Sequence, residues 1–301
     1  MSELEDFVKH PKTDAHNHLN LGMRYASYVP WARFLIPNFP RTMNGLAEMH
    51  EVISTFTRPR CSTAEDVRDV ISLAIEDAIA DSVTVLEGSI DLQFVGHYNE
   101  DYDAFLGMIS GLVEKYKDKI IFRPELGIGK TFDDAKVQKW VPILMKSGVF
   151  KSVDLYGPET FDGLERFTAL YELAGKLGLK RKAHVGEFSD AASVKKLVEE
   201  FALEEVQHGI GAAKDDKVLQ FLADKKIRCN VTPTSNVLLS AVKKLEDHPI
   251  KKMFEAGVRL SIGTDDLLFF NRSVSEECLD LENAGVLTKE QIFKILDDFE
   301  K

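Results

Sequence analysis

Two histidines separated by one residue, His16 and His18, end the first β-branched run of the chain. Because alternate side chains of a strand point to the same face, both imidazoles are expected on one face. A third histidine, His184, ends a later run, and Asp265 ends the last one. Three imidazoles and a carboxylate suit zinc or another divalent transition metal, and suit calcium or magnesium poorly. We therefore expect these four residues to form a metal site if the fold brings the run ends together.

Binding a metal ion does not by itself require three further polar side chains that stand at expected strand ends. Glu187 follows His184 by three positions, and a carboxyl held in an apolar site near a metal can stay protonated and act as a general acid. His208 can be a fourth nitrogen ligand or can hold the metal-bound water. Asp265 and Asp266 point to different sides, so one can ligate and accept a proton while the other binds substrate. The structural alternatives are a solvated loop carboxylate for Glu187, a core histidine for His208 and a helix N-cap for Asp266.

The elements that must position these side chains follow a repeating order. Short β-branched runs alternate with longer segments of helical period. The expected strands are 12–16, 82–90, 120–128, 150–157, 180–187, 204–211, 227–235 and 259–266. The expected helices are 64–81, 101–117, 133–148, 162–178, 190–201, 215–226, 248–257, 273–285 and 288–300. Such a series fits either a doubly wound open sheet or a closed (β/α)8 barrel.

The turn after the first expected strand favours the barrel. It contains His-Asn-His-Leu-Asn and lacks the glycine-rich phosphate turn that a doubly wound sheet needs. A barrel needs about 250 residues, and the 301 residues of this chain allow for it with one insertion over 20–63. We therefore expect an α/β fold, a (β/α)8 TIM barrel formed by 1–301 as a single domain. In this fold the chemistry lies at the C-terminal ends of the strands.

The 20–63 insertion is expected to form short helices over the barrel mouth and to close over ligand as a lid. Several of its aromatic side chains can stack on a base or pack in the core, and the sequence does not separate these two roles. They are Tyr28, Trp31, Phe34 and Phe39.

Composition and charge exclude several classes of function. The formal net charge of −11 repels phosphate backbones, so a general nucleic-acid-binding protein is not expected. The sequence has no apolar run of the roughly 18 residues that a membrane span needs. Its acidic N-terminus lacks the features of a secretory signal, and its three scattered cysteines are expected to be reduced thiols. These features indicate a cytoplasmic protein without membrane or nucleic-acid partners, and they leave the oligomeric state open.

Five segments together resemble the adenosine deaminase branch of the metal-dependent amidohydrolases. They occur in the family's order and span most of the chain. The segments are 11–19, His-Val-Gly-Glu at 184–187, Gln-His-Gly at 207–209, Asn-Val-Thr-Pro-Thr-Ser-Asn at 230–236 and Ser-Ile-Gly-Thr-Asp-Asp at 261–266. The His-x-Gly-Glu and Thr-Asp-Asp elements in combination are specific to this branch.

This resemblance implies a role for each matching residue. The residues that match the family's ligands for one zinc ion per chain are His16, His18, His184 and Asp265. Glu187 matches the acid that protonates a purine ring nitrogen, and His208 matches the residue that orients the attacking hydroxide. Asp266 matches a carboxylate that contacts the other purine ring, and Gly157 matches a glycine whose backbone N–H meets the purine edge. Asn20 stands where the nucleoside enzymes have an acid that contacts the ribose, and its neutral amide can still bind a hydroxyl.

The resemblance implies zinc-dependent hydrolytic deamination of adenosine or a related aminopurine nucleoside or base. The products would be ammonia and a 6-oxo purine of the inosine or hypoxanthine type. An alternative is a related amidohydrolase that acts on another cyclic amide or amidine, often with two metals bridged by a lysine at the end of strand four. The segment 154–157 contains no lysine, which favours one metal. A non-catalytic barrel is disfavoured because the ligand set is intact.

Overall fold

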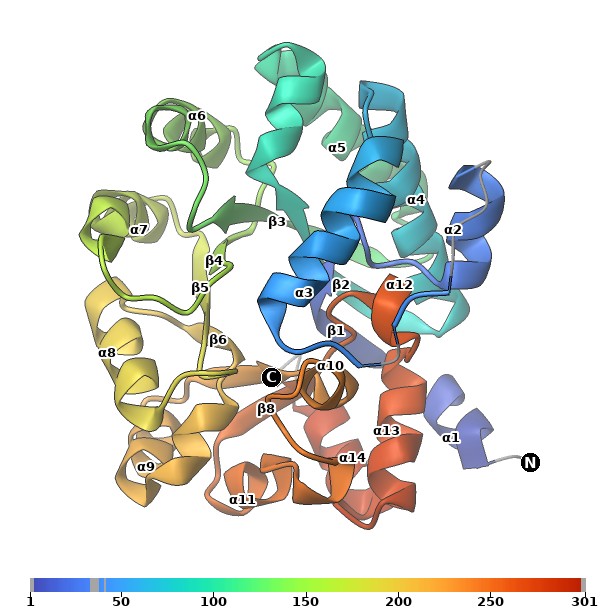
Figure 1. Cartoon of the computed structure of the whole chain (residues 1–301), viewed down its shortest axis with the longest axis vertical. Coiled ribbons are helices and arrows are strands. Elements are labelled where there is room, and N and C mark those ends of the chain that lie inside the picture. The colour runs from blue at the N-terminus through green and yellow to red at the C-terminus, as the bar shows by residue number, and fades with distance from the viewer. Residues whose placement is uncertain (1–2, 33–37, 41, 299–301) are drawn as a thin grey trace.

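Eight parallel strands form the centre of the computed structural model, with helices around them (Figure 1). The strands pair in chain order and are β1 (Lys12–His18), β2 (Val83–Asp91), β3 (Ile121–Gly129), β4 (Ser152–Tyr156), β5 (Lys180–Val185), β6 (Glu205–His208), β7 (Arg228–Val231) and β8 (Arg259–Ile262). The structure describes residues 3–32, 38–40 and 42–298. The expected (β/α)8 TIM barrel is therefore confirmed.

The first and last strands meet at the C-terminal end of the barrel. The backbone N–H of His18 donates to the carbonyl of Asp265 at 3.1 Å, and the N–H of Asp265 donates to the carbonyl of His16 at 2.8 Å. Beneath these bonds the buried Asp14 carboxylate of β1 accepts from the Thr264 hydroxyl at 2.6 Å. This junction holds two histidines and an aspartate, which are far apart in the sequence, on adjacent segments of backbone.

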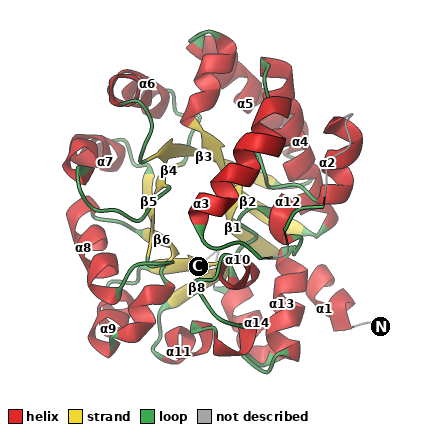
Figure 2. Cartoon of the chain, viewed as in Figure 1, coloured by secondary structure: helices red, strands yellow, loops and turns green. Residues whose placement is uncertain are grey.

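Helices surround the strands, as the ring of red ribbons in Figure 2 shows. The helices at predicted positions are α4 (Ala64–Ala80), α5 (Tyr102–Tyr116), α6 (Asp134–Lys146), α7 (Thr168–Lys176), α8 (Ala191–Phe201), α9 (Asp216–Asp224), α11 (Ile250–Glu255), α13 (Val274–Asn283) and α14 (Lys289–Asp297). Short helices that the sequence did not predict are α1 (Glu3–Lys9), η3 (Leu92–Tyr98), η5 (Ile210–Lys214), α10 (Pro233–Leu238), η6 (Leu245–Asp247) and α12 (Leu267–Phe270). A further short helix, η4 (Leu164–Phe167), leads into α7 within the predicted segment 162–178. Within the described residues, no helix combines the length and the apolar character needed to cross a membrane.

Three strand predictions extended too far. The segments 204–211, 227–235 and 259–266 leave the sheet after His208, Val231 and Ile262. The backbone of His208 turns into the left-handed region, with φ of 64°, and Pro233 begins α10 because its fixed φ suits the first turn of a helix. Apolar and β-branched residues thus continue past the true ends of these strands.

The 20–63 insertion contains α2 (Tyr25–Ala32), α3 (Leu46–Val52) and the helical turns η1 (Ile53–Thr57) and η2 (Arg58–Arg60). Hydrogen bonds fasten it to the segment after β7, because Met43 N–H donates to the Leu238 carbonyl at 2.7 Å. Tyr28 is buried in the core, and Phe39 packs edge-on against Phe269 at a centroid distance of 4.5 Å. These aromatic side chains, with Trp31, pack against the core; Phe34 lies outside the described residues.

A charged cluster fills the barrel interior below the C-terminal ends of the strands. The Lys182 ammonium is fully buried and lies 2.7 Å from Glu87, 2.8 Å from Glu125 and 3.5 Å from Glu205. Burial alone lowers the pKa of Lys182, but the three carboxylates outweigh it and raise that pKa above its ordinary value. The amine therefore stays charged and links three strands through ion pairs shielded from water.

Replacing Lys182 with methionine should lower the free energy of unfolding by about 3–5 kcal/mol, because it leaves buried carboxylates without their shared cation. The matched control is Lys180→Met, since Lys180 also pairs with Glu87 and Glu205 but is one-third exposed. Its loss should be about 1 kcal/mol or less. Urea unfolding of both variants at pH 7 measures the difference, and equal losses would contradict the role assigned to the buried cluster.

Candidate metal centre and active site

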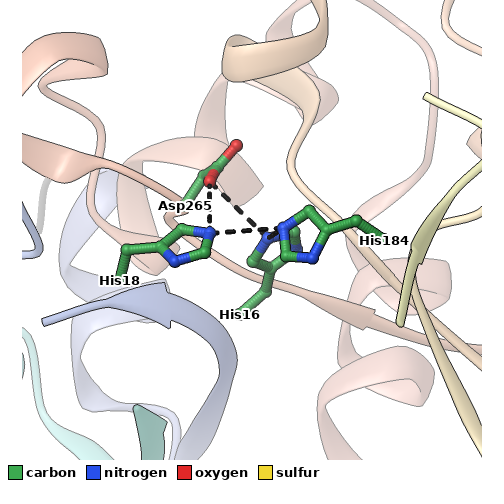
Figure 3. Close-up of side chains that lie close together, drawn as sticks. All are labelled: His16, His18, His184 and Asp265. Carbon is green, nitrogen blue, oxygen red and sulfur yellow. Dashed lines mark hydrogen bonds and ion pairs between the residues drawn. The ribbon is translucent and has the colours of Figure 1, made fainter. Parts of the chain in front are cut away.

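Three histidine nitrogens and one carboxylate oxygen converge at the C-terminal end of the barrel (Figure 3). The His184 Nε2 lies 3.1 Å from His16 Nε2 and 3.2 Å from His18 Nε2. The Asp265 Oδ1 lies 3.5 Å from both His16 Nε2 and His18 Nε2. The structure thus brings the four predicted ligands together, with all four ligand atoms within 4.8 Å of one another.

The partners of the other ring nitrogens decide which atoms face the centre. His16 Nδ1 donates to the Asn230 carbonyl at 3.1 Å, and His184 Nδ1 lies 3.0 and 3.1 Å from the two carboxylate oxygens of Asp154. Burial lowers the pKa of His16 to about 4 and that of His184 well below its ordinary value, so both rings are neutral at pH 7. A neutral ring that donates through Nδ1 presents a lone pair at Nε2.

This donor set fits a zinc ion. Opposed lone pairs at 3.1 Å repel one another unless a cation lies between them. Zinc–nitrogen bonds of about 2.0–2.1 Å place neighbouring ligand atoms of a tetrahedron about 3.3–3.4 Å apart, close to the spacings among His16, His18 and His184. The Asp265 Oδ2 accepts from the Ser235 hydroxyl at 2.6 Å, which leaves Oδ1 directed toward the histidines.

The backbone at two strand ends is bent to aim these side chains. His208 and Asp265 have φ of 64° and 58°, a left-handed conformation that non-glycine residues rarely adopt. Gly157, after β4, has φ of 104° and faces the same cavity. The positive φ values turn the chain sharply inward where each strand ends, so that a side chain or a backbone N–H points into the barrel mouth.

Glu187 and His208 lie beside the four candidate ligands. The Glu187 Oε2 is 3.5 Å from His208 Nε2, and the Glu187 Oε1 accepts from the Asn236 amide at 3.0 Å. Burial raises the pKa of Glu187 well above its ordinary value, and the charges of Asp265 and Glu159 raise it further. Burial and these two charges thus favour the protonated form of the Glu187 carboxyl, which is the form that a general acid requires.

Glu159, in the loop after β4, holds the segment that carries Glu187. Its carboxylate accepts hydrogen bonds from the backbone N–H groups of Gly186 at 3.0 Å, Glu187 at 2.8 Å and Ser189 at 2.8 Å. The sequence analysis did not assign this residue. Its position two residues after Gly157 was the available signal, but nothing in the spacing shows that the loops after β4 and β5 meet.

The three predicted substrate-contacting residues line one cavity of about 480 Å³ together with three of the candidate ligands, His18, His184 and Asp265. Asp266 is the N-cap residue of α12, yet its side chain makes no capping hydrogen bond. The Asp266 Oδ1 and the Asn20 Oδ1 are both buried without a hydrogen-bond partner in the described structure. Gly157, which directly follows β4, also lines this cavity. Unpaired buried oxygens are rare in folded proteins, and here they mark positions where a ligand can supply the missing donors.

The insertion contributes the outer wall of this cavity. Half of its lining side chains are apolar and half are polar. They are Leu46, Met49, His50, Ile53, Ser54 and Arg58. Three of the aromatic residues considered for base stacking, Tyr28, Trp31 and Phe39, do not line this cavity and pack in or against the core.

Asp154 is a second residue that sequence analysis did not assign. The segment 154–157 was matched without a role for its first residue, and the structure places this buried carboxylate against His184. A carboxylate that accepts from the far nitrogen of a ligating histidine fixes its tautomer and orientation. The end of β4 thus supplies a supporting carboxylate and, as the sequence indicated, no lysine.

Comparisons with known proteins identify the family of the chain. The model of the family described as "Adenosine deaminase" matches residues 11–297. A Treponema pallidum protein with the provisional name adenosine/adenine deaminase is 53% identical over 96% of this chain and 97% of its own length. An adenine deaminase from Rhodopseudomonas palustris is 25% identical over 98% of this chain and 90% of its own length.

Solved structures share the fold. The adenine deaminase from Arthrobacter aurescens has a TM-score of 0.84 at 20% identity, covering 95% of this chain and 91% of that one. An amidohydrolase from Burkhoderia ambifaria, with bound Zn, has a TM-score of 0.80 at 21% identity over 97% of this chain and 85% of that one. The chain belongs to the adenosine deaminase family. The expected family is confirmed.

Replacing Asp154 with asparagine should weaken zinc binding by about 10- to 100-fold, because the acceptor that orients His184 is lost. The matched control is Asp81→Asn, since Asp81 is also a buried carboxylate but accepts from Ser273 and Ser275 far from the centre. Competition with a chromophoric chelator measures the affinity of each variant. An unchanged zinc affinity in Asp154→Asn would contradict the orienting role.

Proposed function

We propose that this protein hydrolytically deaminates adenosine or a related aminopurine nucleoside or base, releasing ammonia and leaving a 6-oxo purine. The observation that carries the proposal is that two buried side chains, Glu187 and His208, line a single cavity together with members of the three-histidine, one-aspartate centre. The Treponema pallidum relative, which is named for adenosine/adenine deamination, supports the substrate class.

One zinc ion per chain would be held by four residues, and those residues are His16, His18, His184 and Asp265. When bound, zinc lowers the pKa of a coordinated water to about 7 and so supplies hydroxide near neutral pH. Two of the ligands are prepared for this ion, because Asn230 and Asp154 direct the Nε2 lone pairs of His16 and His184 inward.

Glu187 is proposed as the proton donor to a ring nitrogen of the purine. Protonation of that nitrogen lets water add to the adjacent amino-bearing carbon with less loss of aromatic stabilisation. Asp265 returns the proton that it took from the water to the amino group, the carbon–nitrogen bond breaks and ammonia leaves. The hydroxyl on the same carbon gives its proton back to Glu187 as the 6-oxo group forms. Burial of Glu187 keeps its proton available at the pH where hydroxide is also present.

His208 and Asp265 are proposed to handle the attacking water. His208 lies at ring-centroid distances of 4.6 Å from His16 and 5.2 Å from His184, so it borders the centre from the β6 side. It orients the attacking oxygen and stabilises its charge, while Asp265 accepts the proton. The Ser235 hydroxyl that donates to Asp265 holds that carboxylate in place.

Asp266, Gly157 and Asn20 are proposed to bind the substrate. The unpaired Oδ1 of Asp266 can accept from a protonated or N–H edge of the purine, and the Gly157 backbone can meet the ring edge. The unpaired Oδ1 of Asn20 can accept from a hydroxyl or an N–H group. Because Asn20 is neutral, it suits both a nucleoside and a free base.

An ammonia-release screen of adenosine, deoxyadenosine, adenine and substituted relatives tests the proposal, with Glu187→Gln as the key variant. The variant should lose about 10²- to 10⁴-fold in kcat while its zinc content stays at one equivalent. Glu172→Gln, at an exposed position on α7, is the control and should retain full rate. Release of a carboxylate product instead of ammonia, or an unchanged rate in Glu187→Gln, would refute the proposal.

The pH dependence follows from the donor role of Glu187. An acid must be protonated to donate, so kcat/KM should fall as pH rises through the pKa of Glu187. Glu159→Gln removes a negative charge that raises this pKa, so the alkaline decline should move to lower pH. Glu159→Asp keeps the charge and should keep the decline close to its wild-type position. A decline at the same pH in all three proteins would show that another group is responsible.

A further inference from the structure

One buried histidine, His248, lies outside the proposed catalytic machinery but is connected to it. It sits before α11 and is 3% exposed. Its Nε2 lies 3.2 Å from the Asn236 Oδ1, and Asn236 in turn reaches both Glu187 and His208. The residues form a chain that runs from the backbone of α11 to Glu187, the proposed proton donor, and to His208, which is proposed to orient the attacking oxygen.

The backbone fixes the tautomer of His248. The Ile250 N–H donates to His248 Nδ1 at 3.2 Å, and a backbone N–H can act only as a donor. The Nδ1 must therefore carry a lone pair, and in a neutral imidazole the proton then lies on Nε2. Burial lowers the pKa of His248 to about 3, so the ring is neutral at working pH. His248 consequently presents an N–H group to Asn236.

The proton on His248 in turn fixes the orientation of the Asn236 amide. Because Nε2–H of His248 is a donor, the Asn236 atom facing it must be the carbonyl oxygen, Oδ1. The amide NH2 then faces the other way, 3.0 Å from the Glu187 Oε1 and 3.1 Å from the His208 Nδ1. Asn236 has two N–H groups, one for each of these acceptors.

The second contact of His208 does not decide its tautomer. The Thr232 hydroxyl lies 3.0 Å from the same His208 Nδ1, but a hydroxyl can donate or accept. The Asn236 NH2 can only donate, so it requires His208 Nδ1 to be the acceptor. The ring proton of neutral His208 is then on Nε2, the nitrogen on the side of Glu187.

We propose that His248 is a positioning residue: through Asn236 it fixes the proton of Glu187 on Oε2 and the proton of His208 on Nε2. A carboxylic acid accepts best at its carbonyl oxygen, so the Glu187 oxygen that accepts from Asn236 is the unprotonated one. This inference rests on the proposed function for its catalytic consequence, but the tautomers themselves do not depend on it. Without His248 the Asn236 amide can rotate, and both protons lose their fixed positions.

Two variants separate positioning from packing. His248→Gln keeps an amide N–H near the position of the imidazole Nε2, whereas His248→Asn is too short to reach Asn236 but can still accept from Ile250. With the best aminopurine substrate, His248→Asn should lose on the order of 10- to 100-fold in kcat with KM within about 2-fold, because proton placement matters in the transition state and not in binding. His248→Gln should recover most of the lost rate. Rates are normalised to zinc content and to the folded fraction.

A second measurement reports the histidine tautomers directly and does not depend on enzyme activity. Two-bond ¹H–¹⁵N correlation spectra of the zinc-loaded, ring-¹⁵N-labelled protein report the tautomer of each of the eight histidines. In the wild-type protein, His248 and His208 should both show the Nε2–H form. In His248→Asn, the His208 signals should shift toward a mixture of tautomers, and His248→Gln should restore the Nε2–H form.

The outcomes are distinguishable. An Nδ1–H form of His248 in the wild-type protein, or an unchanged His208 tautomer in His248→Asn, would overturn the proposal. Equal losses of kcat in both variants would also overturn it, since packing alone would then explain them. If no aminopurine is deaminated by the wild-type protein, the proposed function fails, and the tautomers in the spectra still decide the positioning role.

Discussion

The convergence of three unprotonated imidazole nitrogens on one point constrains much of the structure. At 3.1–3.2 Å, lone pairs on His16, His18 and His184 repel one another, and folding must hold them there before any ion offsets that cost. Hydrogen bonds to the far nitrogens of His16 and His184 stabilise this arrangement. So does the junction of β1 with the segment after β8, which places Asp265 beside two of the histidines. The barrel therefore provides the rigid frame that three otherwise repelling groups require.

The ligand set could be predicted from sequence because it depends on two simple regularities. Alternation along a strand places His16 and His18 on one face, and parallel strands bring their C-terminal ends to one rim. Neither rule needs knowledge of side-chain packing. The same regularities located all eight strands, although they overran the ends of three, where a left-handed residue or Pro233 interrupts an otherwise β-branched run.

The supporting residues could not be predicted in the same way. Glu159, Asn236 and His248 act through contacts between loops whose mutual arrangement is set by the whole fold. Their residue types are ordinary for loops, and their spacing from the ligands carries no periodicity. Asp154 lay within a matched segment, yet its role became visible only when β4 and β5 were placed side by side. Sequence thus indicates the groups that do the chemistry more readily than the groups that hold them.

Strand β5 places two residues that need different surroundings on the same face of the barrel. Lys182 belongs among three carboxylates in the interior, and two positions later His184 belongs at the rim. A slip of β5 by one residue would turn both side chains outward, burying Ala183 where a cation is needed and leaving the acids uncompensated. The ion pairs of Lys182 therefore help to fix the register of β5, and with it the position of His184.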